Sequence, residues 1–536
     1  MNRLLFRLNI KTIFHSLIFY LFLFFTVFGY AFFGFNIYLI RHYTNFLYFF
    51  NGLEYMDAVM YVLLFCVAAF FAQQKYTLEK VCFIPTGKII CMRYLSVAAA
   101  SSVIILLPVL FMAVSAVLEG VSVTYTLLCI LYAVIRWIII IATAEAAGFL
   151  VGFATKSVFS YLFSIPFAFV FTILNENLFT FIFKSDFDNL YKFVNLFSIQ
   201  RMFLNGLEVE YRGPQLDMAL FSKLFLALAL FFTVFFIIRI IAQKKIKLKA
   251  AAGALVSAAF VFIFSYLFLT FHPVRYEVDQ KLYIQNYNPQ PFEIVSISGD
   301  INLNEWSYYS LSVRINGSGS QTPVTLRLDE SMQINKFEIL GQPVSYEREG
   351  DLVTFDSTGG DFTLDISCRG RVSYVSSVNS TNIYTSATSC ALPPDFAFLP
   401  KIDGDRSKKQ YNLFVTSLNT LVSNLDISRN GNTYTLTGNA SEVCLFTGFL
   451  TEYQKDGSIV YRAKYNQITD YDKVLERHVN QSRFVFDRQK AEVVEGDITL
   501  MPKMFLIYCN YGTGGFAIPY DDYILISYGN VSAVPQ

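Results

Sequence analysis

One stretch decides the class of this protein: VTYTLLCILYAVIRWIIIIATAEAAGFLVGF, at residues 123–153. Its charged side chains are Arg136 and Glu145, and the rest of the run is apolar, small or uncharged. A helix crosses the roughly 30 Å hydrocarbon core of a bilayer with about 20 apolar residues. An amphipathic helix of a soluble core would instead carry charges at helical spacing along one face. The stretch therefore predicts a transmembrane helix.

The composition of the whole chain agrees with this prediction. The 536 residues are 54% hydrophobic and 15% charged, and the mean hydropathy is +0.43. Soluble globular proteins are about 25% charged, so the composition argues against an ordinary cytosolic enzyme. Seven segments qualify as spans, namely 13–40, 57–73, 96–118, 123–153, 158–174, 218–242 and 250–271.

The charges divide the chain into two halves. Residues 1–271 hold 20 Lys and Arg against 11 Asp and Glu, whereas residues 272–536 hold 22 against 30. A net charge of +1 therefore hides a basic apolar half and an acidic polar half. Neither half carries the clustered basic face of a nucleic-acid-binding protein. We expect a membrane domain followed by a water-exposed domain.

The distribution of Lys and Arg predicts the orientation. If the N-terminus is cytoplasmic, the loops on that side carry twelve Lys and Arg and the opposite loops carry five. Cytoplasmic loops of membrane proteins are enriched in these residues. The count predicts a multi-pass protein of the cell membrane with a cytoplasmic N-terminus. After seven spans, residues 272–536 are expected to be extracytoplasmic.

The segment between the second and third predicted spans reads AQQKYTLEKVCFIPTGK, at residues 72–88. A short amphipathic turn ends at Pro85, because proline cannot continue a helix. The segment resembles the coupling segment of type-2 ATP-binding-cassette exporter permeases, although Tyr76 stands where that family has Gly. The residues that match or flank the pattern are Thr77, Glu79, Pro85 and Lys88.

This resemblance implies a six-span permease-like membrane domain over residues 1–242, with 243–271 as a seventh transmembrane helix. It implies a separate ATPase subunit that docks on the coupling segment and moves the helices as rigid bodies. The alternative is an ordinary basic loop. The chain has no Gly-x-x-x-x-Gly-Lys-Ser/Thr motif, so ATP hydrolysis is expected in that separate subunit and no cofactor is expected here. A homodimer and a pair with a second permease both remain open.

Arg136 and Glu145 are intramembrane charges in this prediction. A charge at mid-membrane costs at least a few kcal/mol, so each is expected to face protein or water and to have a partner. Nine residues separate them, which is about 13 Å along a helix, and they project from opposite sides. We do not expect them to pair with each other. A place on a substrate pathway and a structural hydrogen bond to a neighbouring helix both remain open.

From Tyr276 the pattern changes to short alternating runs separated by turn signals, which predicts an all-β extracytoplasmic sandwich over 272–465. The expected strands are Tyr308–Ile315, Val324–Leu328, Lys336–Leu340, Val353–Asp356, Phe362–Cys368, Tyr411–Val415, Tyr434–Thr437 and Val443–Phe446. The expected turns are Asn316-Gly317, Glu349-Gly350-Asp351, Gly359-Gly360 and Asn430-Gly431.

The runs FEILGQPV (337–344) and FTLDISCRG (362–370) resemble the N-terminal β-sandwich of membrane-alanyl-aminopeptidase-like gluzincin peptidases, with Cys368 in place of the usual Tyr. This resemblance implies that residues 466–536 form a small α/β extension like the start of a peptidase domain, without its catalytic motif. Gly514, Gly515 and Phe516 fall where that family has its substrate-binding strand. We therefore expect a peptide ligand on an exposed strand edge near 512–527.

The histidines argue against a zinc peptidase. A gluzincin needs His-Glu-x-x-His, because two histidines four apart on one helix face bind zinc and the Glu activates water. None of the four histidines is followed by Glu, and no two are four residues apart; they are His15, His42, His272 and His478. We expect no metal and no catalytic residue, and interpret the β domain as a binding or scaffold module.

Four cysteines lie in the acidic half: Cys368, Cys390, Cys444 and Cys509. An oxidising compartment permits disulfides, and four cysteines allow three connectivities. A disulfide between Cys368 and Cys390 is the simplest prediction.

These observations favour the permease subunit of an ATP-binding-cassette exporter that carries a peptidase-like binding domain. A membrane-anchored, non-catalytic part of a peptidase system is the first alternative, although seven spans exceed what an anchor needs. An extracytoplasmic ligand receptor is the second, although the predicted cytoplasmic loops offer no output domain.

Overall fold

The computed structural model divides into two compact units, which are described separately. The helical unit comprises Met1–Met202 and Met218–His272, and the β unit comprises Phe203–Asp217 and Pro273–Gln536. The structure describes residues 2–35, 46–74, 86–118, 120–155, 157–172, 196, 213–214, 216–243, 248–271, 274–276, 292–305, 308–319, 323–357, 360–376, 382–386, 388–402, 405, 407–455, 457–464, 484–487, 492–495, 501–506 and 517–526.

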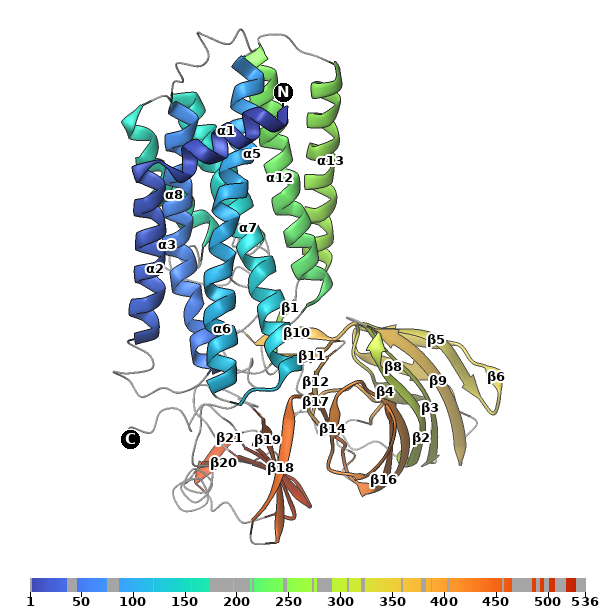
Figure 1. Cartoon of the computed structure of the whole chain (residues 1–536). Helices are drawn as coiled ribbons and strands as arrows, with labels where there is room; N and C mark the ends of the chain where they lie inside the picture. Colours follow the sequence, from blue (N-terminus) through green and yellow to red (C-terminus); the bar gives the residue numbers. More distant parts are fainter. Residues whose placement is uncertain are drawn as a thin grey trace. The chain divides into compact units, whose positions relative to one another are not determined.

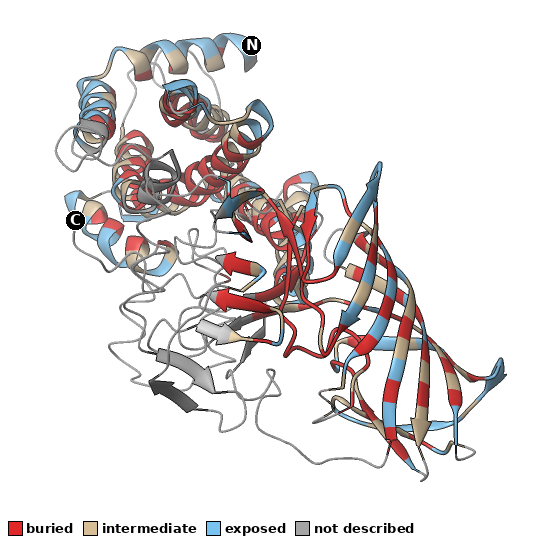
Figure 2. Ribbon diagram, turned by 90° about the horizontal axis from the view of Figure 1, so that it is seen from below, coloured by how far each residue is buried: buried red, intermediate tan, exposed pale blue. Residues whose placement is uncertain are grey.

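The helical unit is a bundle of mostly apolar helices that pack side by side (Figure 1). The helices are α1 (Asn2–Phe14), α2 (Leu17–Phe35), α3 (Phe46–Gln73), α5 (Thr86–Ser101), η2 (Ser102–Ile105), α6 (Leu106–Leu118), α7 (Val123–Thr155), η3 (Val158–Phe163), α8 (Ser164–Phe171), α12 (Met218–Gln243) and α13 (Leu248–Phe271). Figure 2 shows buried residues on the inward faces of these helices and exposed residues on the outward faces. The prediction of an N-terminal region with several apolar helices is confirmed.

Five described helices are long and apolar enough to cross a membrane, which is compatible with a multi-pass membrane protein. A sixth span is added if α1 and α2, which meet at 62°, count as one broken span. The predicted segment 158–174 is not a full span in the described residues. Its described part is the Val158–Phe171 pair of η3 and α8, which by itself is shorter than the about 20 residues of a span.

The β unit contains four sheets. Their strand orders are β15-β16-β13-β2-β3-β9-β5-β6, β1-β10-β11-β12-β17-β14, β4-β8-β7 and β18-β19-β22-β24-β23-β20-β21. The strands are β1 (Val274–Tyr276), β2 (Phe292–Glu305), β3 (Tyr308–Gly319), β4 (Val324–Arg327), β5 (Met332–Ile339), β6 (Gln342–Pro343), β7 (Tyr346–Glu349), β8 (Leu352–Phe355), β9 (Phe362–Gly370), β10 (Ser373–Ser376), β11 (Asn382–Thr385), β12 (Cys390–Leu392), β13 (Lys409–Thr416), β14 (Thr420–Val422), β15 (Asp426–Asn430), β16 (Thr433–Ala440), β17 (Leu445–Gly448), β18 (Leu450–Lys455), β19 (Ser458–Ala463), β20 (Phe484–Asp487), β21 (Glu492–Glu495), β22 (Lys503–Leu506), β23 (Ala517–Pro519) and β24 (Tyr523–Ile526).

Alternating side chains build the core of this unit. On β3, Tyr309, Leu311, Val313 and Ile315 are buried and the residues between them are more exposed. Figure 2 shows this alternation of buried and exposed residues along the long strands. Strand neighbours point to opposite faces of a sheet, so this register places all four side chains in one layer. Buried side chains of all four sheets join into one hydrophobic cluster. The predicted β-rich C-terminal region is confirmed, and its sheets share this core.

Each of the eight predicted strands overlaps an observed strand, but the turn predicted at Asn316-Gly317 is wrong. Both residues lie inside β3, where Gly317 is opposite Ile294 of β2 and Phe362 of β9. A Cβ atom at Gly317 would lie 2.4 Å from the Phe362 ring. This glycine therefore makes room for an aromatic ring rather than for a turn.

The seven-stranded sheet begins at Leu450, before the predicted domain boundary at residue 465. Its strands β19, β22 and β24 run parallel to one another, and β18 pairs antiparallel with β19. The described part of 466–536 consists of strands that complete this sheet, so the boundary predicted from sequence cuts through a hydrogen-bonded layer.

Candidate functional site

Two glycines bring helices α3 and α7 into backbone contact. A Cβ atom at Gly148 would lie 2.3 Å from the carbonyl oxygen of Phe65, and one at Gly152 would lie 2.6 Å from that of Ala69. The two glycines are four residues apart and so share one face of α7, which is the spacing of close helix pairs in membranes. Only glycine permits this approach, and α3 and α7 therefore pack as a tight pair.

A buried ion pair joins the same two helices. Arg136 of α7 donates from Nε to Oδ2 of Asp57 of α3 at 2.8 Å, and its Nη2 donates to the same oxygen. The two side chains are 4% and 1% exposed. Arg136 therefore has a charged partner, as expected for an intramembrane charge. Asp57 lies at the first position of a predicted span and was not identified from the sequence.

Glu145 lies on the same helix but does not pair with Arg136. Its side chain is fully buried and faces Ser101 at the end of α5. Neither carboxylate oxygen has a hydrogen-bond partner among the described residues at normal geometry. Arg136 and Glu145 thus face different neighbours, α3 and α5, which agrees with their spacing on the helix.

Arg93 joins the two ends of the predicted coupling segment. It lies on α5, 1% exposed, and its Nη1 donates to the carbonyl oxygens of Phe71 at 3.0 Å and of Gln74 at 2.5 Å. These carbonyls belong to the last turn of α3, where a cation is favoured by the helix dipole and by unsatisfied acceptors. These bonds hold the end of α3, which precedes residues 75–85, against α5, which follows them.

A second contact ties this corner to the end of α7. Gln73, the last residue of α3, donates from Nε2 to the Ser157 carbonyl oxygen at 2.9 Å and to Ser160 Oγ at 2.5 Å. Ser157 caps η3, which follows α7 directly. Arg93 thus links the end of α3 to α5, and Gln73 links it to η3. The Asp57–Arg136 pair and the Gly148/Gly152 contact link α3 to α7.

The residues of the coupling motif itself are only partly described. Thr77, Glu79 and Pro85 lie outside the described residues, and Lys88 is a half-buried residue in the first turn of α5. Arg93, Gln73 and the Gly148/Gly152 pair carry the contacts around them. The four-residue spacing of the two glycines can be read from the sequence. The role of Gln73 cannot, because it depends on a contact with η3, which is distant in the sequence.

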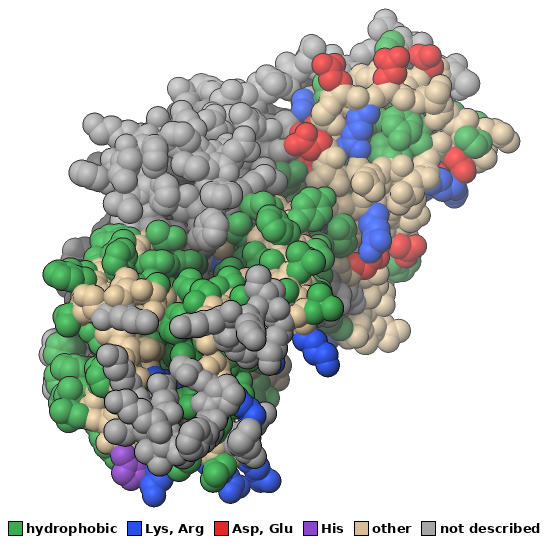
Figure 3. Space-filling model, turned by 90° about the horizontal axis from the view of Figure 1, so that it is seen from above, with side chains coloured by type: hydrophobic (Ala, Val, Ile, Leu, Met, Phe, Trp, Pro, Cys, Tyr) green, Lys and Arg blue, Asp and Glu red, His purple; other side chains and the backbone are tan. Residues whose placement is uncertain are grey.

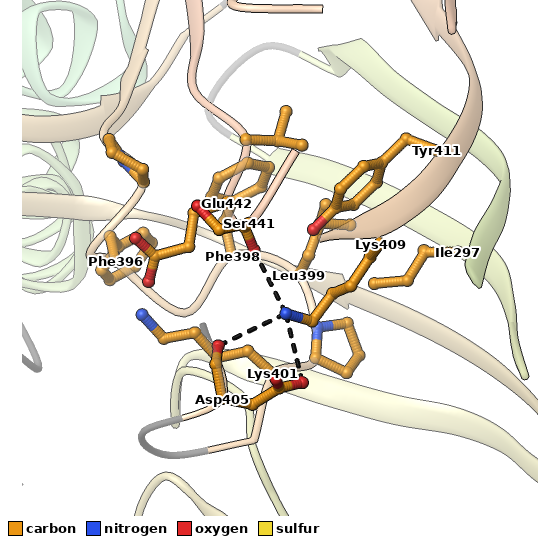
Figure 4. Close-up of a pocket in the computed structure, with 13 residues that line it drawn as sticks. Ile297, Phe396, Phe398, Leu399, Lys401, Asp405, Lys409, Tyr411, Ser441 and Glu442 are labelled. Carbon is orange, nitrogen blue, oxygen red and sulfur yellow. Dashed lines mark hydrogen bonds and ion pairs between the residues drawn. The ribbon is translucent and has the colours of Figure 1, made fainter. Parts of the chain in front are cut away.

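The β unit contains a small cavity lined by Ile297, Phe396, Phe398, Leu399, Tyr411 and polar neighbours (Figure 4). At its wall, the ammonium group of Lys409 donates to the carbonyl oxygens of Ser407 at 3.0 Å and Ser441 at 3.2 Å and pairs with Asp405 Oδ2 at 3.1 Å. The cavity measures about 30 Å³, which admits water but not a small organic ligand. Lys409 is a structural cation that holds two loops together.

The strands described near the predicted peptide edge at 512–527 lie inside their sheet. Strand β23 pairs with β24 on one side and with β20 on the other, and β24 pairs with β22 and β23. Both strands therefore have a neighbour on each side, and β23 meets β20 at the Val485–Ala517 pair. Gly514, Gly515 and Phe516 lie outside the described residues. Between the two strands, Tyr520 donates to Asp395 Oδ2 at 2.6 Å and anchors the turn to the sandwich.

The predicted disulfide is wrong. Cys368 on β9 and Cys390 on β12 are both free. The Cys390 thiol donates to the Leu445 carbonyl oxygen at 3.6 Å. Burial raises the pKa of each thiol to about 12, so both are protonated at neutral pH. Within the described ranges, no group of three His, Cys, Asp or Glu residues is placed to hold a metal ion.

No protein-family model matches this chain, and no curated protein matches it. Solved structures similar to it are LTA4 hydrolases and M1 zinc metallopeptidases. Yeast LTA4 hydrolase in complex with bestatin is 12% identical with a TM-score of 0.32, covering 47% of this chain and 42% of that chain. The M1 zinc metallopeptidase from Deinococcus radiodurans is 11% identical with a TM-score of 0.29, covering 48% and 64%.

The chain thus spans about two fifths of the length of the yeast enzyme and about two thirds of the bacterial one. These neighbours belong to the class of peptidases that the sequence of the β unit resembles. At this identity and TM-score, the similarity assigns neither an activity nor a substrate to this chain.

Proposed function

We propose that the helical unit is the permease subunit of an ATP-binding-cassette exporter. The observation that carries the proposal is the corner made by Arg93, which fixes both ends of residues 75–85. A docking segment transmits force only if its ends are attached to the helices that move. A loop whose ends were free would absorb the displacement of a partner instead.

Further contacts of α3 would transmit a movement of residues 75–85 to other helices. From the end of α3, Gln73 reaches η3, and the Gly148/Gly152 contact carries α7 along with α3. Packed helices move as rigid bodies because their interfaces resist continuous deformation. A push on residues 75–85 therefore moves α3 and α7 together. The Asp57–Arg136 pair ties the two helices farther along their length.

The proposal assigns ATP hydrolysis to a separate subunit and gives this chain no catalytic residue. The proposed orientation counts residues 158–174 as one crossing, as the sequence predicts. The N-terminus and residues 75–85 then face the cytoplasm, where that subunit resides, and the β unit is extracytoplasmic. The charge count of twelve against five supports this orientation. The cargo and its direction are then set by the helices and by the partner.

The test is the ATPase activity that accompanies the full-length chain. We expect a tagged chain, purified in mild detergent from its native membranes, to bring with it a phosphate-loop ATPase whose hydrolysis responds to the chain. Glu79→Ala and Pro85→Ala should lower that response while leaving the amount of chain in the membrane unchanged. Glu338→Ala, on a strand of the β unit, is the matched control and should have no effect.

Deletion of residues 76–86 provides the opposing outcome. If the deleted chain inserts and still stimulates the ATPase normally, the docking role of the segment is refuted. If no ATPase accompanies the full-length chain and none encoded beside it responds to the chain, the permease proposal itself fails.

A further inference from the structure

Helix α1 sorts its side chains onto distinct faces. Leu5, Asn9 and Ile13 are buried and recur every four residues. The helix packs against α5, where Ser96 Oγ donates to the Phe6 carbonyl oxygen at 3.4 Å. The opposite, exposed face carries a basic stripe, defined here as Arg3, Arg7 and Lys11, again at four-residue spacing.

Exposed apolar side chains run beside the basic stripe. Leu4 and Leu8 are 62% and 40% exposed, respectively, on the helix flank next to Arg3 and Arg7. The helix contains no Asp or Glu. None of the three cations makes an ion pair with any described residue. A water-facing helix would bury or lack these leucines, whereas a helix at a bilayer surface would expose both features.

The neighbouring helix places α1 at the level of the lipid headgroups. Helix α2 is apolar around its whole circumference and exposes large side chains such as Phe24, Phe28 and Phe32, as expected in hydrocarbon. Helix α1 leaves α2 at 62°. Three cations in one helix are unsuited to the bilayer core. An amphipathic helix of this kind lies in the interface plane with its apolar side toward the acyl chains.

We propose that the basic stripe of α1 binds the phosphates of anionic phospholipids. Its cations span about 12 Å along the helix, so neighbouring headgroups can be engaged at once. Leu4 and Leu8 enter the acyl region beneath them. The exposure of these leucines favours a lipid over an acidic protein surface. Figure 3, which views this end of the helical unit, shows Lys and Arg side chains at its rim beside extensive hydrophobic surface.

The experiment measures lipid selectivity of the full-length chain. Detergent-solubilised chain is equilibrated with micelles that contain equal amounts of phosphatidylcholine and phosphatidylglycerol, then re-purified, and the retained lipid classes are quantified. The wild type should retain phosphatidylglycerol in excess. The Arg3→Gln/Arg7→Gln/Lys11→Gln variant should lose at least about fivefold of that excess, since a single Lys or Arg near an anionic surface already contributes about that factor.

Two controls separate this from general charge effects. Arg314→Gln/Lys336→Gln/Arg369→Gln removes the same number of cations from the β unit and should leave the phosphatidylglycerol excess unchanged. Arg3→Lys/Arg7→Lys preserves the charge and should also preserve the excess, provided that it elutes as a monodisperse peak like the wild type. High salt should weaken retention by the wild type.

The proposal is overturned if the Gln variant, monodisperse in detergent, retains as much phosphatidylglycerol as the wild type. If that variant keeps its lipid but loses a co-purifying protein, the stripe is a protein-docking surface instead. If inorganic phosphate displaces the lipid more effectively than chloride at equal ionic strength, the site recognises free phosphate. The lipid result does not depend on an ATPase, so its failure leaves the permease proposal standing.

Discussion

Arg136 of α7 and Asp57 of α3 form an ion pair with both side chains at most 4% exposed. A buried pair is strongly destabilised when one partner is removed, because the remaining charge is left uncompensated. Removing both partners and replacing them with apolar groups costs much less. The pair therefore makes different predictions for single and double variants.

We expect Asp57→Leu and Arg136→Met each to lower the stability of the detergent-solubilised chain by about 3–5 kcal/mol. The double variant should recover most of that loss. Thermal unfolding monitored by circular dichroism in one detergent measures the difference. Equal losses in the double and the more harmful single variant would show that the pair is not coupled.

Because α3 and α7 are in backbone contact at Gly148, a larger side chain there should strongly lower the stability of the protein. A Cβ atom there meets the Phe65 backbone, which cannot move aside, whereas a Cβ atom at Gly253 meets only the Phe236 ring of α12. Gly148→Ala should therefore lower the unfolding temperature clearly more than Gly253→Ala. Thermal scans of both variants under identical conditions provide the comparison, and a larger effect at Gly253 would contradict the packing described here.

The orientation of the helical unit predicts which sites a membrane-impermeant thiol reagent reaches. Glu349 and Lys249 are both exposed, and they are assigned to opposite sides of the membrane. In intact cells Glu349→Cys should be labelled, and Lys249→Cys should be labelled only after permeabilisation. Labelling of Lys249→Cys alone in intact cells would invert the orientation.

Local patterns predicted the elements that depend on neighbouring residues, and missed the contacts that depend on distant ones. Alternation marked β3, β9 and β13, because each strand has one face in the core. It could not show that β13 runs parallel to β2, which lies more than a hundred residues away in sequence. The interior position of β23 is of the same kind, since it follows from pairing with β20 and β24.

The helical site divides in the same way. Arg136 and Glu145 were identified as residues that need partners, because the free-energy cost of a charge inside an apolar run can be read from the neighbouring sequence. The identity of the partners, Asp57 and the region of Ser101, depends on which helices are adjacent. Hydropathy alone does not register that the helix described in the apolar run at 158–174 ends at Phe171.

The free thiols of the β unit give a prediction that depends on pH. Burial raises the pKa of Cys368, Cys390 and Cys444 to about 12, against about 8.5 in an unfolded chain. Above about pH 8.5 the unfolded chain releases protons that the folded chain keeps, so the free energy of unfolding falls as pH rises. Iodoacetamide should not modify these thiols in the native protein at pH 8.

After denaturation without a reductant, peptide mapping should find Cys368 and Cys390 alkylated. Protection that only a reductant removes would reveal a disulfide. Modification of the native protein at pH 8 would show instead that the strands carrying these thiols open locally.

The corner at Arg93 yields the prediction that bears most directly on function. Its guanidinium binds the Phe71 and Gln74 carbonyls, so Arg93→Gln releases the end of α3 from α5 without changing residues 75–85. A partner ATPase should therefore still bind, but its hydrolysis should lose most of its response to the permease. Lys249→Gln, which removes one exposed cation from the first turn of α13, is the matched control and should retain the response. Co-purification measures binding and phosphate release measures hydrolysis, in one preparation. Loss of binding in Arg93→Gln would place Arg93 in the docking surface itself, and an unchanged response would mean that α3 and α5 need not move together.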